Sequence, residues 1–255
     1  VDHVSLHILR HETFGLVGES GCGKSTLGRT ITRLYEPTEG KILYDGTDIS
    51  HLTGPQLLPY RKRIQMIFQD PYASLDSRMT VMDIIREALD LHSELTTKEQ
   101  RSQRVYELLD HVGLMREHAN RYPHEFSGGQ QQRVGIARAL AASPEILLMD
   151  DPFGAVDEIT RAQLQTELKR IWQQTGITVL FVTHDISEAL KLGSRVLVMD
   201  AGKIEQYAPP EELLRAPATD FVHRLVEKER RACRLPDGQL IDCEFSGAGA
   251  ARPKQ

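Results

Sequence analysis

Short apolar runs bounded by turn-forming residues recur along the chain, at residues 14–17, 42–44, 64–68, 146–149, 178–182 and 196–199. Runs of this length, without strict alternation, are typical of strands that are buried on both faces. Helical patterns lie between several of them. The sequence therefore predicts an α/β fold with a mainly parallel sheet, whose ligands bind at the carboxyl ends of the strands.

A second pattern interrupts this alternation. Between Val81 and Ala119 apolar residues recur at helical spacing, which predicts an almost wholly helical insert. Pro123 and the triplet Ser-Gly-Gly at 127–129 end the insert, and a further helix is expected at 130–142.

The two ends of the chain carry weaker patterns. Val4, Leu6 and Ile8 alternate with polar residues as in a strand, and the first residue is Val1 rather than Met, so we expect the natural protein to begin upstream. From residue 236 onward the sequence has no periodicity and ends in Ser-Gly-Ala-Gly-Ala-Ala-Arg-Pro-Lys-Gln, which is typical of a poorly ordered tail.

The composition and charge of the chain exclude several classes of protein. The 255 residues are 40% hydrophobic and 26% charged, as in ordinary globular proteins. A net charge of −5 lacks the basic excess of a nucleic-acid-binding protein, so no nucleic-acid partner is expected. Three cysteines are too few for a disulfide framework, which favours the cytosol. No stretch approaches the ~18 apolar residues of a membrane-spanning helix, so a membrane role is expected to come through a partner.

A glycine-rich loop follows the first predicted strand. Residues 18–25, Gly-Glu-Ser-Gly-Cys-Gly-Lys-Ser, match G-x-x-x-x-G-K-[ST] and open a predicted helix at 25–34. The glycines let successive backbone N–H groups turn inward around an anion. Lys24 is expected to neutralise phosphate oxygens and Ser25 to bind Mg²⁺, whereas Cys22 has no evident chemical role. The alternative, a glycine-rich turn that carries lysine by chance, is disfavoured by the strand–loop–helix context.

Two carboxylates end the apolar run at 146–149. They lie at the edge where an α/β sheet presents its ligands. Phosphoryl transfer needs a carboxylate for the metal and a group that positions the attacking water, which makes Asp150 a candidate Mg²⁺ ligand and Asp151 the candidate for the water. The alternative is an acid pair that only caps the next turn.

A further motif, Ser-Gly-Gly-Gln-Gln-Gln-Arg at 127–133, follows the phosphate loop and precedes the strand that ends in Asp150. Gln69 follows the third apolar run, Asp157 ends Gly-Ala-Val-Asp, and His184 lies in Val-Thr-His-Asp. Together and in this order, the motifs resemble those of the ATP-binding cassette (ABC) family.

The resemblance covers residues 1–226 and implies a fold. It is a P-loop NTPase ABC ATPase domain with a mainly parallel core sheet, an N-terminal antiparallel β subdomain and a helical subdomain at about 75–140. The remainder, 227–255, is expected to be a partly disordered C-terminal extension.

The resemblance also implies how ATP is used. Two subunits close head-to-tail on two ATP molecules, and each γ-phosphate lies between Lys24 of one subunit and Ser127 and Gly129 of the other. The amides and hydroxyl at Ser127 form this second anion site at a helix N-terminus. Hydrolysis removes the bridging charge, and the dimer opens.

The family's site residues carry over position by position. The resemblance implies that Gln69 contacts Mg²⁺ and the attacking water, that His184 bonds the γ-phosphate, and that Asp157 organises the contact between subunits. The catalytic set is Asp151, His184 and Gln69, and the metal set is Ser25, Gln69 and Asp150. The ATP-binding set is Gly18, Glu19, Ser20, Gly21, Cys22, Gly23, Lys24, Ser25, Thr26, Ser127, Gly128, Gly129, Gln130 and Asp157.

Two positions depart from the family. Most members have Glu where this chain has Asp151, and the loss of one methylene predicts slow hydrolysis with intact ATP binding, unless local backbone shifts compensate. The aromatic residue that stacks on adenine in the family would precede Val1. Without it, affinity is expected to fall, since such stacking is worth roughly 1–3 kcal/mol.

The two halves of the chain resemble different branches of the family. Residues 69–80 and 121–127 are similar to subunits that energise peptide import. Residues 148–157, 185–193 and 206–214 are similar to subunits that serve glycine betaine and related quaternary amines. Natural recombination, an intermediate lineage and engineering are each consistent with such a mosaic.

The leading functional prediction is an ATP-hydrolysing subunit of a peptide or quaternary-amine importer, peripheral on the inner face of the cell membrane. The resemblance implies a homodimer or heterodimer, integral membrane permease subunits bound between the Gln69 segment and the helical insert, and, indirectly, a substrate-binding protein. Residues 71–79 are a candidate docking surface. The alternatives are a hydrolysis-impaired regulatory subunit and a soluble ABC ATPase clamp that is not coupled to transport.

Overall fold

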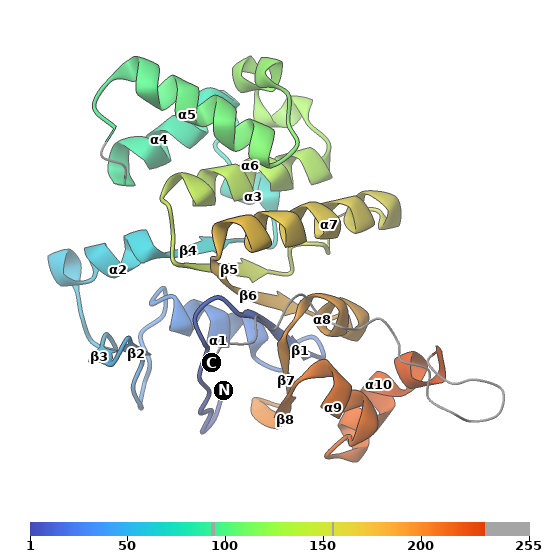
Figure 1. Ribbon diagram of the computed structural model, residues 1–255. Coiled ribbons are helices and arrows are strands. Elements are labelled where there is room, and N and C mark those ends of the chain that lie inside the picture. Colours follow the sequence, from blue (N-terminus) through green and yellow to red (C-terminus); the bar gives the residue numbers. More distant parts are fainter. Residues whose placement is uncertain (93–94, 155, 233–255) are drawn as a thin grey trace, which may run out of the picture. The chain divides into compact units, whose positions relative to one another are not determined.

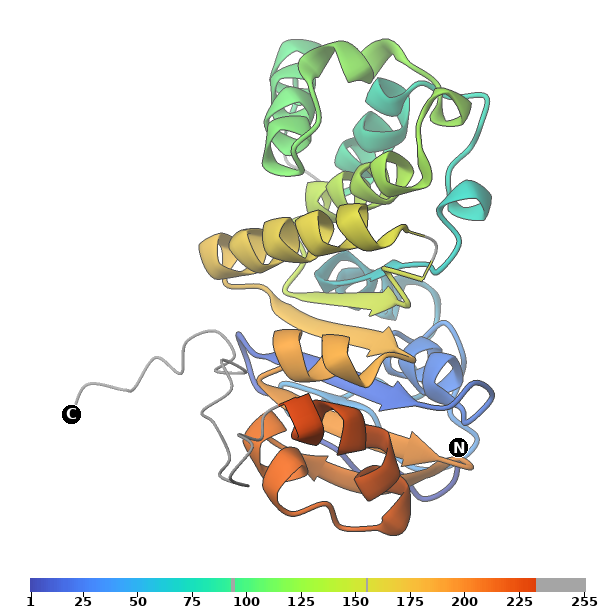
Figure 2. The same ribbon diagram turned by 90° about the vertical axis from the view of Figure 1, so that its right-hand side faces the viewer.

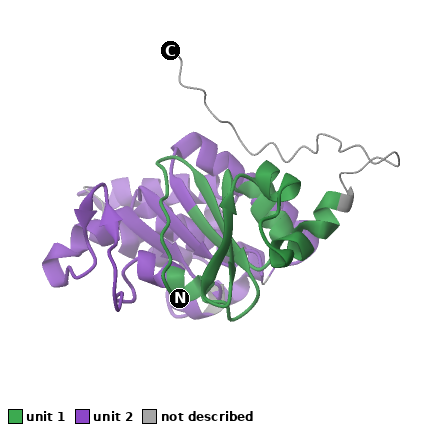
Figure 3. Cartoon of the chain, turned by 90° about the horizontal axis from the view of Figure 1, so that it is seen from below, with its two compact units in different colours: residues 1–27, 180–255 green, residues 28–179 purple. Residues whose placement is uncertain are grey.

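The computed structural model describes residues 1–92, 95–154 and 156–232 (Figure 1). The chain divides into two compact units (Figure 3). The first unit is formed by residues 1–27 together with the chain from 180 onward, and the second by residues 28–179. Helix α1 (Lys24–Ile31) and strand β6 (Thr178–Thr183) each run from one unit into the other.

The first unit is built on strands in the order β6-β1-β7-β8. β1 and β7 are parallel, from Phe14 beside Arg195 to Gly18 beside Met199, and β8 is antiparallel to β7. Apolar side chains bury β1 and β7 almost completely, as the uninterrupted runs predict. Helix α8 packs on β1, and α10 contacts α8, α9 and β8 (Figure 2). Their bounds are β1 (Thr13–Gly18), β7 (Arg195–Asp200), β8 (Lys203–Ala208), α8 (Ile186–Leu192), α9 (Pro210–Arg215) and α10 (Asp220–Ala232).

The second unit pairs β4 with β5 in parallel and holds a separate antiparallel pair, β2 with β3. Its helical part centres on α6, which contacts α3, α4 and α5 (Figure 1). The strands are β2 (Leu43–Tyr44), β3 (Thr47–Asp48), β4 (Ile64–Ile67) and β5 (Ile146–Asp150). The helices are α2 (Leu58–Arg63), α3 (Pro71–Ser74), α4 (Val81–His92), α5 (Lys98–His111), α6 (Gly128–Ala141) and α7 (Glu158–Thr175), with short 3₁₀ turns η1 (Gly54–Gln56), η2 (Arg116–Asn120) and η3 (Pro123–Glu125).

The predicted fold class is confirmed, with a mostly parallel core sheet, a separate antiparallel pair and the helical insert. The predicted strands are present within one or two residues, whereas β3 and β8 were not predicted. The predicted boundary at residue 226 falls inside α10, and residues 233–255, with Cys233 and Cys243, lie outside the described residues.

The predicted strand at Val4–Ile8 is wrong, because residues 1–12 form no strand. Side chains hold this segment instead. Arg195 of β7 donates to the His7 carbonyl at 3.1 Å and to the Glu12 carboxylate at 2.6 Å, and its guanidinium lies 4.8 Å from the ring centre of Tyr207. The alternation of apolar and polar residues could not show that the Arg195 side chain, rather than a neighbouring strand, would hold this segment.

The predicted helix at 25–34 ends early, at Ile31. Arg33 has a left-handed backbone (φ +58°), which stops the helix. Its guanidinium is buried and donates to the carbonyls of Ile49 and Leu52 at 2.8 and 3.2 Å. These bonds to the β2–β3 region offset the backbone strain of about 1–3 kcal/mol.

Tyr44 generates a prediction about stability. Its hydroxyl donates to Glu145 at 2.6 Å, and burial and that carboxylate raise the pKa of Tyr44 to about 12. A raised folded-state pKa contributes stability that is complete below the unfolded pKa of about 10 and is lost as pH rises towards 12. Tyr44→Phe should lower the free energy of unfolding by about 1 kcal/mol at pH 8 and flatten its decline between pH 10 and 12 in urea titrations. An unchanged decline would contradict this.

Candidate functional site

The phosphate loop of the first unit needs its glycines for two different reasons. Gly21 and Gly23 have left-handed backbones, with φ of +83° and +101°, which favour glycine. Gly18 ends β1 so close to β7 that a Cβ atom there would lie 2.1 Å from the Met199 carbonyl oxygen. The loop is therefore shaped both by its own backbone and by the neighbouring strand.

Lys24 begins α1 with its ammonium directed at the loop. Nζ donates to the carbonyls of Gly18 and Glu19, both at 2.7 Å, and the residue is only 8% exposed. Cys22 is buried, with Sγ 3.7 Å from this ammonium, and its carbonyl accepts from the Gly202 amide. The cysteine for which the sequence indicated no chemical role thus packs the loop. A buried ammonium at the start of a helix offers the positive charge and the N–H donors that a phosphate group needs.

Asp150 ends β5 in the second unit and is almost fully buried, at 1% exposure. Its Oδ2 lies 3.7 Å from Nη2 of Arg29 on α1. Sequence reasoning missed Arg29, although it follows Ser25 by one helical turn and so lies on the same side of the helix. The basic partner offsets part of the cost of burying the carboxylate.

Gln69 and Asp151, far apart in the sequence, are brought together. Gln69 Nε2 donates to Asp151 Oδ2 at 3.2 Å. Asp151 has a left-handed backbone (φ +44°), which Asp tolerates better than most residues. A Cβ atom on Gly154 would lie 2.5 Å from Asp151 Oδ2, so this glycine leaves room for the carboxylate.

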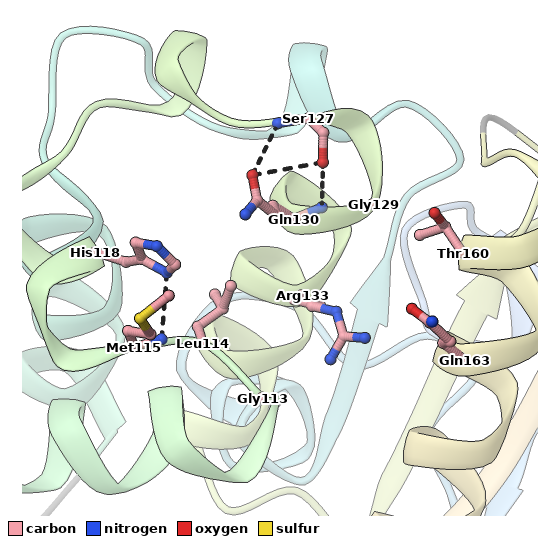
Figure 4. A pocket seen from close by; sticks show the side chains of 10 residues that line it. All are labelled: Gly113, Leu114, Met115, His118, Ser127, Gly129, Gln130, Arg133, Thr160 and Gln163. Carbon is pink, nitrogen blue, oxygen red and sulfur yellow. Dashed lines mark hydrogen bonds between the residues drawn. The ribbon is translucent and has the colours of Figure 1, made fainter.

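Ser127 caps α6 through a reciprocal capping box. Its hydroxyl accepts from the Gln130 amide at 3.4 Å, and the Gln130 side chain accepts from the Ser127 amide at 3.1 Å. A pocket of about 350 Å³ opens beside this cap (Figure 4). All its lining residues belong to the second unit: Gly113, Leu114, Met115, His118, Ser127, Gly129, Gln130, Arg133, Thr160 and Gln163.

Asp157 and His184 flank regular elements. Asp157 caps α7 by accepting from the Thr160 amide at 3.0 Å, and this bond lowers the pKa of Asp157. His184 is exposed directly after β6, in the turn before α8. Asp185 caps α8 by accepting from the Ser187 amide at 2.8 Å, which fixes the backbone next to His184.

The residues that the sequence predicts as metal ligands carry oxygen donors. Ser25 of the first unit, and Gln69 and Asp150 of the second, each offer an oxygen atom, which is the donor type that Mg²⁺ prefers. Since Gln69 uses its amide nitrogen towards Asp151, its oxygen is the atom left for a metal. Across the described residues, no group of three or more His, Cys, Asp or Glu side chains is arranged to hold a metal ion.

Each helix in the part of the chain that the structure describes is too short or too polar to span a lipid bilayer.

The chain is similar to known proteins. Residues 1–154 match the family model described as ABC transporter. The chain is 50% identical over 238 residues to the oligopeptide transport ATP-binding protein OppF of Bacillus subtilis (strain 168), covering 93% of this chain and 77% of that protein. Because this alignment extends over both halves, it gives no support to a glycine-betaine origin of the second half, which stays a prediction.

Solved structures are similar as well. A dimeric post-hydrolysis state of the ATP-binding cassette MJ0796, bound to ADP and Pi, superposes with a TM-score of 0.73 at 34% identity, covering 80% of this chain and 88% of that one. cbiO1 from Clostridium perfringens, part of the ABC transporter complex cbiONQ, superposes with a TM-score of 0.75 at 26% identity, covering 90% and 88%.

Gly18 provides a test of the loop's packing. In Gly18→Ala the new methyl group meets a main-chain carbonyl that cannot move without breaking the β1–β7 pairing. We expect the free energy of unfolding to fall by about 2–3 kcal/mol in urea titrations. The control is Gly135→Ala on α6, where nothing lies within 4 Å of the added Cβ, and stability should rise by up to about 1 kcal/mol. Equal stability of the two variants would contradict the assigned packing.

Proposed function

Because the chain belongs to the ABC transporter family and has its ATPase fold, we propose that it is the ATP-hydrolysing subunit of a peptide importer. The similarity to the oligopeptide transport protein, over 93% of this chain, carries the proposal. The buried ammonium of Lys24 and the glycines of its loop supply the matching chemistry. Neither the regulatory subunit nor the soluble clamp is supported by these comparisons.

We further propose that two copies, or one copy and a related subunit, close on ATP. The solved relative bound to ADP and Pi is dimeric, which supports this arrangement. Lys24 would bind the β- and γ-phosphates of its own nucleotide. Ser127 and Gly129, at the N-terminus of α6, would bind the γ-phosphate held by the partner.

The proposed chemistry assigns one task to each polar group. Ser25, Gln69 and Asp150 would hold Mg²⁺, which neutralises charge on the phosphates when bound. Asp151, oriented by its bond with Gln69, would hold the attacking water, and His184 would bond the γ-phosphate. Asp157 would hold the contact between subunits through the turn that it caps.

Coupling to transport requires a surface for permease subunits. We propose that the segment after β4 and the helical part around α4–α6 bind them, which would place the protein on the inner face of the membrane with a substrate-binding protein outside. Phe68, directly after β4, is 37% exposed. Later in the same segment, Arg78 forms an ion pair with Asp76. The side chain of Tyr72, part of the predicted docking surface, lies outside the described residues.

The decisive experiment reconstitutes the chain with peptide permease subunits in proteoliposomes. We expect ATP-dependent uptake of a labelled oligopeptide and none of labelled glycine betaine. Uptake of glycine betaine alone would replace the peptide proposal by the quaternary-amine one. Failure to copurify with either permease, with ATPase activity intact, would contradict a role in import.

Lys24 and Ser127 should separate the two anion sites. Lys24→Ala removes a charge-assisted contact and should weaken MgATP binding by a single chain about 10–100-fold, as measured with a fluorescent ATP analogue. Ser127→Ala should leave that binding unchanged but weaken MgATP-driven dimerisation, as measured by light scattering. Loss of monomer binding in Ser127→Ala would show that the two sites are not separate.

The short side chain of Asp151 should limit the rate of ATP hydrolysis. Asp151→Glu restores the missing methylene and should raise ATP turnover by about tenfold or more, because ~1 Å of misplacement costs up to ~10²-fold. Asp151→Asn, which keeps the size but not the charge, serves as the control and should abolish turnover. An equal or lower rate in Asp151→Glu would mean that the backbone at this position already compensates for the shorter side chain.

A further inference from the structure

Gln131 is a buried polar residue on α6, close to the proposed γ-phosphate site, that the proposed mechanism does not use. Its side chain is fully buried, at 0% exposure. Nε2 donates to two main-chain carbonyls, Pro123 at 2.7 Å and Phe126 at 3.3 Å. Both acceptors belong to the segment that immediately precedes Ser127, so the side chain fastens the approach to that residue.

The chemistry of these contacts requires a donor. Carbonyl oxygens only accept hydrogen bonds, so the amide NH₂ must face them and the amide oxygen must point away. That oxygen is buried and has no hydrogen-bond partner among the described residues. An unpaired buried oxygen is costly, and an apolar side chain of similar size would avoid the cost. Glutamine is therefore favoured here only by the two bonds that it makes to the segment.

The same segment is held from its other side. Phe126 is only 5% exposed, and its ring packs edge-to-face on His118, with 5.4 Å between ring centres. His118 Nδ1 in turn accepts from the Met115 amide at 3.2 Å. Residue 126 is thus fixed by its backbone through Gln131 and by its ring through His118. Because Ser127 is the next residue, these contacts also restrict where its backbone lies.

We propose that Gln131 is a positioning residue for the γ-phosphate site of the partner subunit, acting through the backbone of Phe126 on Ser127. The inference rests on the proposed ATP-driven dimer. Two residues at the start of α6 would then have different functions. Ser127 offers the hydrogen-bond donors for the γ-phosphate, and Gln131 fixes the position of those donors.

The test compares two adjacent buried glutamines. Gln131→Met keeps the shape but removes both side-chain hydrogen bonds to the segment, so that the Pro123 carbonyl keeps only its bond from the Phe126 amide. It should weaken MgATP-driven dimerisation about tenfold and raise the KM for ATP while kcat at saturation changes little. Gln132→Met is the matched control, because Gln132 is 2% exposed and its Nε2 has no hydrogen-bond partner among the described residues. It should dimerise like the wild type. Binding of a fluorescent ATP analogue to a single chain should be unchanged in both.

Gln131→Lys provides a rescue. Lysine supplies only donors and should hold both carbonyls, so its dimerisation should lie within about threefold of the wild type. Wild-type dimerisation by Gln131→Met would overturn the inference, and so would equal losses in a folded Gln131→Lys and Gln131→Met. If Gln131→Met does not fold, a folded Gln131→Lys that fails to dimerise would likewise overturn the inference. Absence of dimers in the wild type would overturn the proposed function instead.

Discussion

The phosphates of ATP carry several negative charges close together, and a site for them needs a cation that is already held in position. In the first unit this cation is the ammonium of Lys24. An unpaired buried ammonium is costly, and Lys24 avoids the cost by donating to two loop carbonyls. Those carbonyls are held because Gly18 lies against β7 and the Cys22 carbonyl bonds the Gly202 amide in the turn before β8. The parallel pairing of β1 and β7 therefore helps to determine the loop geometry. An ammonium that is already held in place needs little reorganisation when it meets an anion.

The second unit meets a different constraint, the burial of negative charge. Asp150 is almost fully buried beside Arg29, and Asp151 has a left-handed backbone and a bond from Gln69. Asp tolerates this backbone because its short side chain can bond locally, whereas longer residues are strained there. In the proposed mechanism the same shortness would withdraw the carboxylate from the attacking water. The backbone at this position and the proposed catalytic role would then favour side chains of different length.

The sequence was sufficient wherever a periodicity or a motif is local. The buried runs located the strands of the parallel sheet, and Gly-Lys-Ser located the start of α1. The sequence was insufficient where a side chain determines the backbone conformation through a contact with residues that are distant in the sequence. The guanidinium of Arg33 bonds a carbonyl that follows β3, and this contact holds the backbone that ends α1. Arg195 bonds the segment before β1, which was predicted to be a strand, through its side chain. The sequence assigned Gln69 and Asp151 separately to the attacking water and did not predict the hydrogen bond between them. Arg29 was missed because no motif marks it.

Helix capping explains how one motif serves both structure and binding. The first four amides of a helix have no intrahelical acceptor, and in α6 the capping box satisfies the amide of Gln130. The amides of Gly128 and Gly129 precede it in the same turn, and a side chain on Gly129 would lie 2.7 Å from the methyl group of Thr160. Glycine therefore keeps α6 and α7 close and leaves the first turn unobstructed. An anion that arrives there completes the hydrogen bonding of the helix, so ligand binding and helix stability favour the same geometry.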